Sequence, residues 1–148
     1  MQNQIAISQI DCDNNRLILR ADCPQFSSRS LFDHFTVPEL LTRWWPQAAV
    51  TEPWSGGSYR LSWPAMDWVL YGEYTQFDPG ERLSFTWLWE HEPNLPMRLV
   101  EIGFESEGDG SRLTLTHGTY SDNERDQEDR QSHLDGWTHF LGQLRALE

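Results

Sequence analysis

Apolar and polar residues alternate along much of this chain, a pattern typical of β-strands that bury one face. In "SYRLSW" (58–63), Tyr59, Leu61 and Trp63 fall on one face and only polar residues fall on the other. Seven segments are predicted to form strands by alternation or by a short apolar run between turns: 16–22, 48–54, 58–63, 68–77, 82–89, 98–105 and 112–120. A shorter apolar segment, 5–8, is a candidate to pair with the first of them.

Turn residues separate these strands at close intervals. The glycine pair at 56–57 and the Asp-Gly pair at 109–110 are hairpin signals, and "DPGE" (78–81) suits a type II turn. Because the connections are short, consecutive strands are predicted to pair antiparallel in a meander.

One predicted strand breaks the alternation. Tyr74 and Phe77 have opposite parity, so a regular strand cannot point both of them inward. This conflict predicts a β-bulge at residues 75–76 and leaves open the face on which Glu73 lies.

Two short helices are predicted after the first strand. Residues 26–36 carry a broad apolar stripe, and Pro38 opens the segment "PELLTRWW" (38–45), as proline does at a first helical position. Adjacent residues on a helix point about 100° apart, so Trp44 and Trp45 cannot fill the same core site. We expect one of them to anchor the helix and the other to line or rim a cavity, and the sequence does not decide which.

The chain is predicted to end in a long helix at about 122–147, with Ser121 or Asp122 as its N-cap. The apolar stripe of this helix consists of Leu134, Trp137, Leu141 and Leu144. The first three turns, 122–133, contain no apolar residue, so only the second half of the helix is expected to pack on a core.

The predicted sheet is too wide for one helix to cover. Seven strands about 4.8 Å apart span roughly 30 Å, whereas a helix is about 10–12 Å across. The sheet is therefore expected to curl around the C-terminal helix, with the short helices closing one edge. Beneath the polar half of that helix lies either an open cavity or a core filled by tryptophans, and the composition does not separate the two.

Composition and charge narrow the function classes. With 148 residues, the chain is expected to form a single domain, 1–148. Its net charge of −12 argues against nucleic acid and anionic membranes as partners. No apolar run is long enough to insert into a membrane and the first residues lack signal-peptide features, so we expect a cytoplasmic protein. The sequence contains no lysine, which excludes Schiff-base and pyridoxal phosphate chemistry.

The two cysteines do not predict a disulfide. Cys12 and Cys23 are separated by the predicted strand at 16–22, whose extended length exceeds the reach of a disulfide. Both are expected to be free thiols, as in a reducing compartment.

Five segments together resemble one known family. They are "FTVPELLTRWWP", "GGSYRL", "GEYTQFDPGERLSFTWLWE", "FESEGDGSRLTLTHGTY" and "HLDGWTHFLGQL", in this order. From about residue 16 onward, the chain resembles the Hsp90-ATPase-activator-like (AHSA1-type) family of the START/Bet v 1 superfamily, also called SRPBCC. The resemblance implies an α+β helix-grip fold, in which a curved seven-stranded antiparallel sheet wraps around a long C-terminal helix. It also implies a cavity between helix and sheet, where superfamily members commonly bind lipids, sterols, hormones or polyketides.

Inward-facing side chains are the candidate ligand-binding residues. Tryptophan rings stack on flat apolar ligands, and a single polar group in an apolar cavity orients them. The candidates are Trp44, Trp45, Tyr59, Leu61, Trp63, Tyr71, Phe85, Trp87, Trp89, Ile102, Phe104, His117 and Trp137. The simpler interpretation of each tryptophan is plain core packing, and that of His117 is a core histidine bonded to the backbone.

The other histidines are not assigned to a site. His91, between two glutamates, lacks the spacing of a zinc helix motif and is expected in a solvated loop. His133 and His139 are six residues apart on the predicted helix and point to roughly opposite sides. Neither a catalytic triad nor a phosphate loop is found, so no catalytic residue, metal or cofactor is predicted.

Three function classes stay open. We favour a carrier, sensor or stress-related binder of a small hydrophobic or aromatic ligand. An enzyme of the same fold, a cyclase, dehydratase or hydrolase, would use His117 with a carboxylate such as Glu73. A protein-interaction module with a chaperone or another protein as partner is the third class, although 148 residues leave no room for the extra N-terminal domain of the Hsp90 co-chaperones. The oligomeric state is not predicted.

Overall fold

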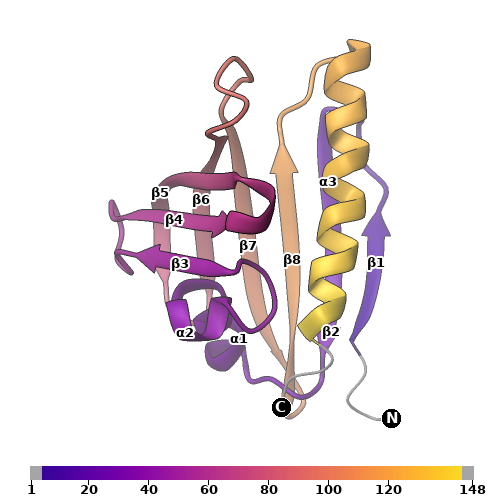
Figure 1. Ribbon diagram of the computed structural model, residues 1–148. Coiled ribbons are helices and arrows are strands. Elements are labelled where there is room, and N and C mark those ends of the chain that lie inside the picture. The colour runs from indigo at the N-terminus through magenta and orange to yellow at the C-terminus, as the bar shows by residue number, and fades with distance from the viewer. Residues whose placement is uncertain (1–4, 145–148) are drawn as a thin grey trace.

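In the computed structural model, residues 5–144 are described, and their strands form one antiparallel sheet (Figure 1). The strands are β1 (Ala6–Ile10), β2 (Arg16–Cys23), β3 (Ala48–Thr51), β4 (Ser58–Trp63), β5 (Trp68–Asp78), β6 (Arg82–Trp89), β7 (Arg98–Glu107) and β8 (Gly110–Gly118). Their spatial order is β1-β2-β8-β7-β6-β5-β4-β3. The sheet thus has eight strands, not the predicted seven, because the candidate segment near the N-terminus pairs with β2 along the whole of β1.

The predicted meander is confirmed from β3 to β8, where each strand pairs with the next. The bulge in β5 is confirmed as well, since the register with β6 shifts between Tyr74 and Gln76. As a result, Tyr74 is buried, and Phe77 packs partly buried against the same core. The last hairpin turns one residue earlier than expected, because Glu107 already pairs with Gly110.

The helices are α1 (Ser28–Thr36), α2 (Pro38–Leu41), the 3-10 turn η1 (Pro64–Met66) and α3 (Glu124–Gln143). Helix α2 is shorter than predicted, and Trp44 and Trp45 lie in the turn that follows it, where both backbone N–H groups still donate to the Leu41 carbonyl. Figure 1 shows α3 running along β8, β2 and β1, whereas α1 and α2 lie at the far end beside β3.

The apolar stripe of α3 packs on the sheet as predicted. Trp137, Leu141 and Leu144 are buried, and Leu134 is half-buried against the core. The polar first half of the helix also docks, contrary to the prediction, because Asp126 is buried and takes part in polar contacts. The two halves of α3 are therefore held on the sheet by different physical means.

The N-cap of α3 lies one to two residues after the predicted caps, Ser121 and Asp122. Asn123 is the N-cap, and its side chain accepts a hydrogen bond of 2.7 Å from the Asp126 backbone N–H. Ser121 does not cap the helix, because its own N–H and hydroxyl both donate to the Asp126 carboxylate at 2.8 Å. The backbone at Asn123 is still extended, so the first helical turn begins only at Glu124.

We expect Asn123→Ala to lower the free energy of unfolding by about 1 kcal/mol, because the Asp126 N–H would lose its acceptor at the helix end. Urea denaturation measures this loss. Asp122→Ala is the matched control, since Asp122 is exposed and does not cap the helix. An equal loss in the two variants would contradict the assignment of the cap.

The two cysteines are free, as expected, and Cys23 is buried. Burial, with a smaller contribution from Asp22, raises the pKa of the Cys23 thiol to about 12, so its reactive thiolate is scarce at neutral pH. Within residues 5–144, no helix is long and apolar enough to cross a membrane.

Candidate ligand-binding site

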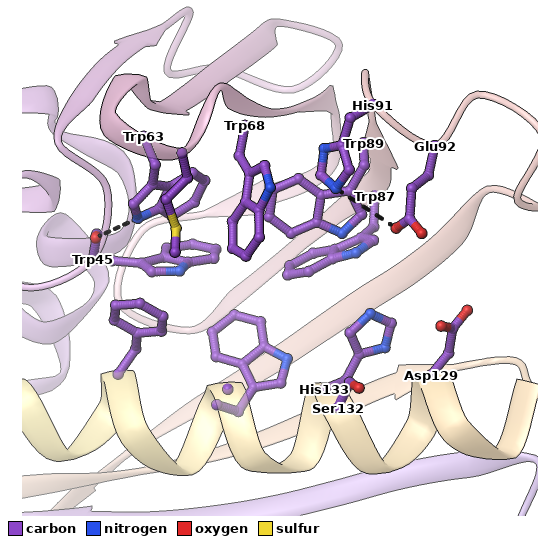
Figure 2. Close-up of a pocket in the computed structure, with 14 residues that line it drawn as sticks. Trp45, Trp63, Trp68, Trp87, Trp89, His91, Glu92, Asp129, Ser132 and His133 are labelled. Carbon is purple, nitrogen blue, oxygen red and sulfur yellow. Dashed lines mark hydrogen bonds and ion pairs between the residues drawn. The ribbon is translucent and has the colours of Figure 1, made fainter.

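A cavity of about 570 Å³ lies between the middle of α3 and the inner face of the sheet (Figure 2). Six tryptophans line it: Trp45, Trp63, Trp68, Trp87, Trp89 and Trp137. The rest of the lining comprises Met66, His91, Glu92, Asp129, Ser132, His133, Gly136 and Phe140. In Figure 2, rings from the sheet and its loops face rings from α3 across the space.

The structure assigns different positions to the two adjacent tryptophans. Trp44 is the anchor, because its indole N–H donates to the His34 carbonyl at 2.8 Å and its ring packs edge-on against Phe35. Trp45 lines the cavity, where its ring lies nearly parallel to that of Trp87, with 6.1 Å between their centroids.

Ring contacts and one hydrogen bond fix the positions of four tryptophans that line the cavity. The Trp63 indole N–H donates to the Trp45 carbonyl at 3.1 Å, which ties β4 to the turn after α2. Trp137 reaches up from α3 to within 5.0 Å of the Trp45 ring and 5.6 Å of the Trp87 ring, measured between centroids. Trp45, Trp63, Trp87 and Trp137 thus come from four separate parts of the chain: the turn after α2, β4, β6 and α3.

Five of the thirteen candidate residues line the cavity: Trp45, Trp63, Trp87, Trp89 and Trp137. Another seven are buried but do not line it: Trp44, Tyr59, Leu61, Phe85, Ile102, Phe104 and His117. Alternation identifies the inner face of a strand but not what covers it, and α1 covers part of that face, where Phe32 and Phe35 pack on Phe104. The thirteenth candidate, Tyr71, is exposed on the outer face.

Apart from Trp137, sequence reasoning missed the lining residues of α3, and it also missed Met66, Trp68 and the loop residues His91 and Glu92. Asp129, Ser132, His133, Gly136 and Phe140 form one stripe at helical spacing. Counting back from Phe140 in steps of three or four residues would have identified this face. His91 lies in an exposed turn, as expected, and also stacks on Trp68 at the cavity rim with 5.5 Å between centroids.

Two stacked histidines lie beside the cavity. His117 is fully buried, and the rings of His117 and His133 are almost parallel, with centroids 4.3 Å apart. The Trp137 indole N–H donates to His117 Nδ1 at 3.0 Å, so Nδ1 is the acceptor and Nε2 carries the proton in the neutral ring. Tyr120 Oη and His133 Nδ1 are hydrogen-bonded at 2.7 Å.

Both histidines are neutral at pH 7. Burial, reinforced by His133 and Arg98, holds the pKa of His117 well below its ordinary value. Burial also lowers the pKa of His133 to about 4, although Asp129 opposes the shift. The predicted partnership of His117 with Glu73 does not form, because Glu73 is exposed and does not line the cavity.

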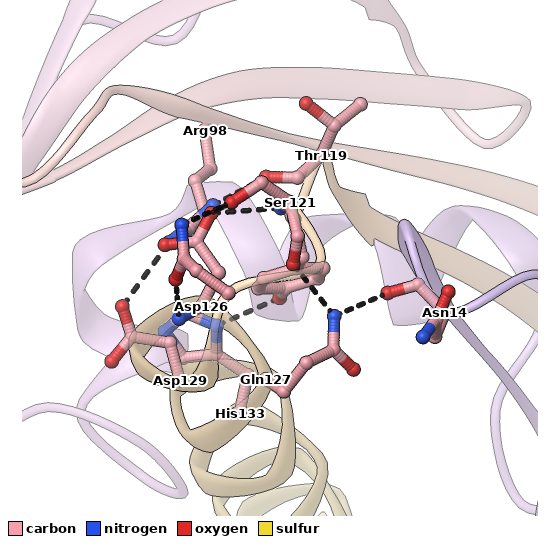
Figure 3. Close-up of polar contacts among 10 residues, drawn as sticks. Asn14, Arg98, Thr119, Ser121, Asp126, Gln127, Asp129 and His133 are labelled. Atoms are coloured by element: carbon pink, nitrogen blue, oxygen red, sulfur yellow. Dashed lines mark hydrogen bonds and ion pairs between the residues drawn. The ribbon is translucent and has the colours of Figure 1, made fainter.

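A buried arginine holds the polar end of α3 (Figure 3). The Arg98 guanidinium lies 3.4 Å from an Asp126 carboxylate oxygen and 3.1 Å from one of Asp129. It also donates to the Thr119 carbonyl and lies 4.5 Å from the centroid of the Tyr120 ring. The docked polar half of the helix thus carries Asp129 and His133 to the cavity.

Within the described part of the chain, no group of three or more His, Cys, Asp or Glu side chains is placed to hold a metal ion. The lining combines aromatic rings, the hydrogen-bonding side chains of Ser132 and His133 on α3, the imidazole of His91 and the carboxylates of Glu92 and Asp129. Such a surface suits non-covalent binding of an organic molecule.

Residues 25–148 match the family model described as "Activator of Hsp90 ATPase homolog 1-like protein". A protein from Rhodobacter sphaeroides has a solved structure with a TM-score of 0.75, 21% identity, and coverage of 97% of this chain and 100% of that chain. CalU16 from Micromonospora echinospora gives a TM-score of 0.68 at 21% identity, covering 97% of this chain and 86% of that chain. Protein MLL2253 from Mesorhizobium loti gives a TM-score of 0.73 at 18% identity, covering 97% of this chain and 96% of that chain. A search of curated proteins gives no match.

Proposed function

Since the chain belongs to the Activator of Hsp90 ATPase homolog 1-like family and has the helix-grip fold of the matched structures, we propose that it binds a small hydrophobic or aromatic ligand between α3 and the sheet. In this proposal it acts as a carrier or sensor. The cavity of about 570 Å³ carries the proposal, because protein interiors are normally close-packed and this volume falls within the usual range for small-molecule sites.

The lining supports an aromatic or similarly flat apolar ligand. Rings stand on both sides of the cavity, so a planar molecule would bury both of its faces. His133 supplies a hydrogen-bonding group from α3, and burial keeps its ring neutral at pH 7.

The experiment is a binding screen with fatty acids, sterols, flavonoids and polycyclic aromatic compounds. Six of the eight tryptophans line the cavity, so a bound ligand should quench a large part of the intrinsic fluorescence. A ligand at 100 times its dissociation constant adds about 2.7 kcal/mol of stability, which should raise the melting temperature by roughly 5–10 °C. If no compound of the panel quenches the fluorescence and none shifts the melting temperature, the proposal is contradicted.

We expect Gly136→Leu to weaken binding of any ligand found in this screen by at least about tenfold. Gly136 lines the cavity, and a Cβ added there meets no atom within 4 Å, so a leucine side chain is expected to extend into the ligand volume. Replacing glycine within a helix should also raise the free energy of unfolding by up to about 1 kcal/mol. Fluorescence titration and urea denaturation measure the two effects.

Gly103→Leu is the matched control for this variant. Gly103 lies between two inward-facing residues of β7, away from the cavity, and a Cβ there also meets nothing within 4 Å. This control should bind like the unaltered protein. Unchanged affinity in Gly136→Leu would show that the ligand binds elsewhere.

A further inference from the structure

Among the described residues 5–144, the side chains that line the cavity of the proposed function carry charge of only one sign. Glu92 and Asp129 are the lining carboxylates, and none of the described arginines lines the cavity. Arg98 lies behind the lining with its side chain 3% exposed, and it is already paired with Asp126 and Asp129. The polar end of the cavity therefore keeps a net negative charge when its histidines are neutral.

The two carboxylates lie together at one end of the cavity. Figure 2 shows Glu92 on the sheet side and Asp129 on the α3 side, beyond Trp87 and Trp89. His91 is the neighbouring titratable group, with its Nε2 atom 3.8 Å from a Glu92 oxygen. A positively charged group of a ligand would meet a carboxylate from each wall at this end.

The aromatic lining favours the same sign of charge. The face of an indole ring carries negative electrostatic potential and attracts ammonium groups, and tryptophan does so most strongly among the aromatic residues. Six tryptophans provide several such faces next to the carboxylates. An anionic ligand would instead face these rings, both carboxylates and a chain of net charge −12 that has no lysine, and the described part of the lining offers it no arginine.

We propose that the ligand is an organic cation, an apolar or aromatic body that carries an ammonium group. The ammonium group binds between Glu92 and Asp129, and the body stacks among the tryptophans. This inference rests on the proposed function, because it names the class of ligand for the same cavity.

Three ligands with one naphthalene body test it. They are (2-naphthylmethyl)trimethylammonium, its uncharged isostere 2-neopentylnaphthalene, and the carboxylate anion of 2-naphthylacetic acid. At pH 8, where ordinary histidines are neutral, and low salt, the cation should bind at least about tenfold more tightly than the isostere. The anion should bind more weakly than the isostere. Tryptophan fluorescence titration measures all three dissociation constants.

Variants at exposed carboxylates separate a local effect from net charge. Glu92→Gln should weaken cation binding about threefold or more, because one of the two carboxylates beside the ammonium group is lost. Binding of the isostere should stay unchanged, because Glu92 is half-exposed and its replacement should not disturb the fold. Glu101→Gln removes the same charge from β7, away from the cavity, and should change neither ligand. Asp129 is unsuitable for this binding test, because its pairing with Arg98 also holds the helix and its loss would alter stability.

The outcomes distinguish this inference from the proposed function. Binding of the isostere with equal or weaker binding of the cation would overturn the inference and leave the proposed function standing. So would failure of all three ligands while another compound of the screen binds. Failure of all three together with a flat screen would overturn both.

Discussion

Arg98→Met should lower the free energy of unfolding by about 3 kcal/mol, the loss typical of removing one partner from a buried ion pair. Methionine keeps much of the side-chain volume but removes the charge and every N–H donor. Asp126 and Asp129 would then stay near the core without their cation, and the Thr119 carbonyl would lose its donor. Urea denaturation at pH 7 measures the change.

The size of this loss follows from burial on both sides of the pair. The Arg98 side chain is 3% exposed, whereas those of Asp126 and Asp129 are 13% and 22% exposed. Water can partly solvate the carboxylates after the arginine is removed, which places the expected loss at the lower end of the range for buried pairs. The Tyr120 ring would also lose its contact with the guanidinium.

Arg60→Met is the matched control, because Arg60 pairs with Glu90 on the surface, where both side chains are about half-exposed. Surface pairs contribute roughly 0–1 kcal/mol, so this variant should stay close to the unaltered protein. Combining Arg98→Met with Asp126→Asn and Asp129→Asn should recover part of the stability, because the uncompensated charges are removed. Equal losses in Arg98→Met and Arg60→Met would show that the buried network does not hold α3.

Most of the fold could be predicted because alternation records which strand face is buried. The strands from β2 to β8, the antiparallel meander and the bulge in β5 all follow from apolar parity and turn residues. Strand β1 carried a weaker signal, because its five residues are exposed or only half-buried at the sheet edge. It pairs through its backbone, which the side-chain pattern does not record.

The site was less predictable, because parity gives the face but not the covering element. Phe104 and Trp87 both point inward, yet α1 covers the first and the cavity adjoins the second. The polar half of α3 was expected to stay free because it lacks apolar residues. It docks because Arg98, buried at the start of β7, pairs with the carboxylates of Asp126 and Asp129. Such a pairing between distant parts of the chain can be recognised only in the folded structure.

The protein should lose about 3 kcal/mol of stability between pH 6.5 and pH 4 through His133 alone, with a further loss from His117. The pKa of His133 falls from its ordinary 6.5 to about 4 on folding, chiefly because of burial. When the pH drops below 6.5, the unfolded chain therefore takes up a proton that the folded protein does not. Stability is complete above pH 6.5 and declines as the pH falls toward 4.

Urea denaturation at half-unit steps from pH 7.5 to pH 4 tests this window. Asp126 should contribute little within it, because hydrogen bonds from the Ser121 backbone and hydroxyl, with Arg98, hold the pKa of its carboxyl below its ordinary 3.8. His133→Gln should reduce the slope of stability against pH by about 1.4 kcal/mol per unit, the value for one proton. His139→Gln, on the exposed side of α3, should leave the slope unchanged. A stability that stays flat from pH 6.5 to pH 4 would mean that the stacked histidines accept protons without unfolding, and hence that water reaches them through the cavity.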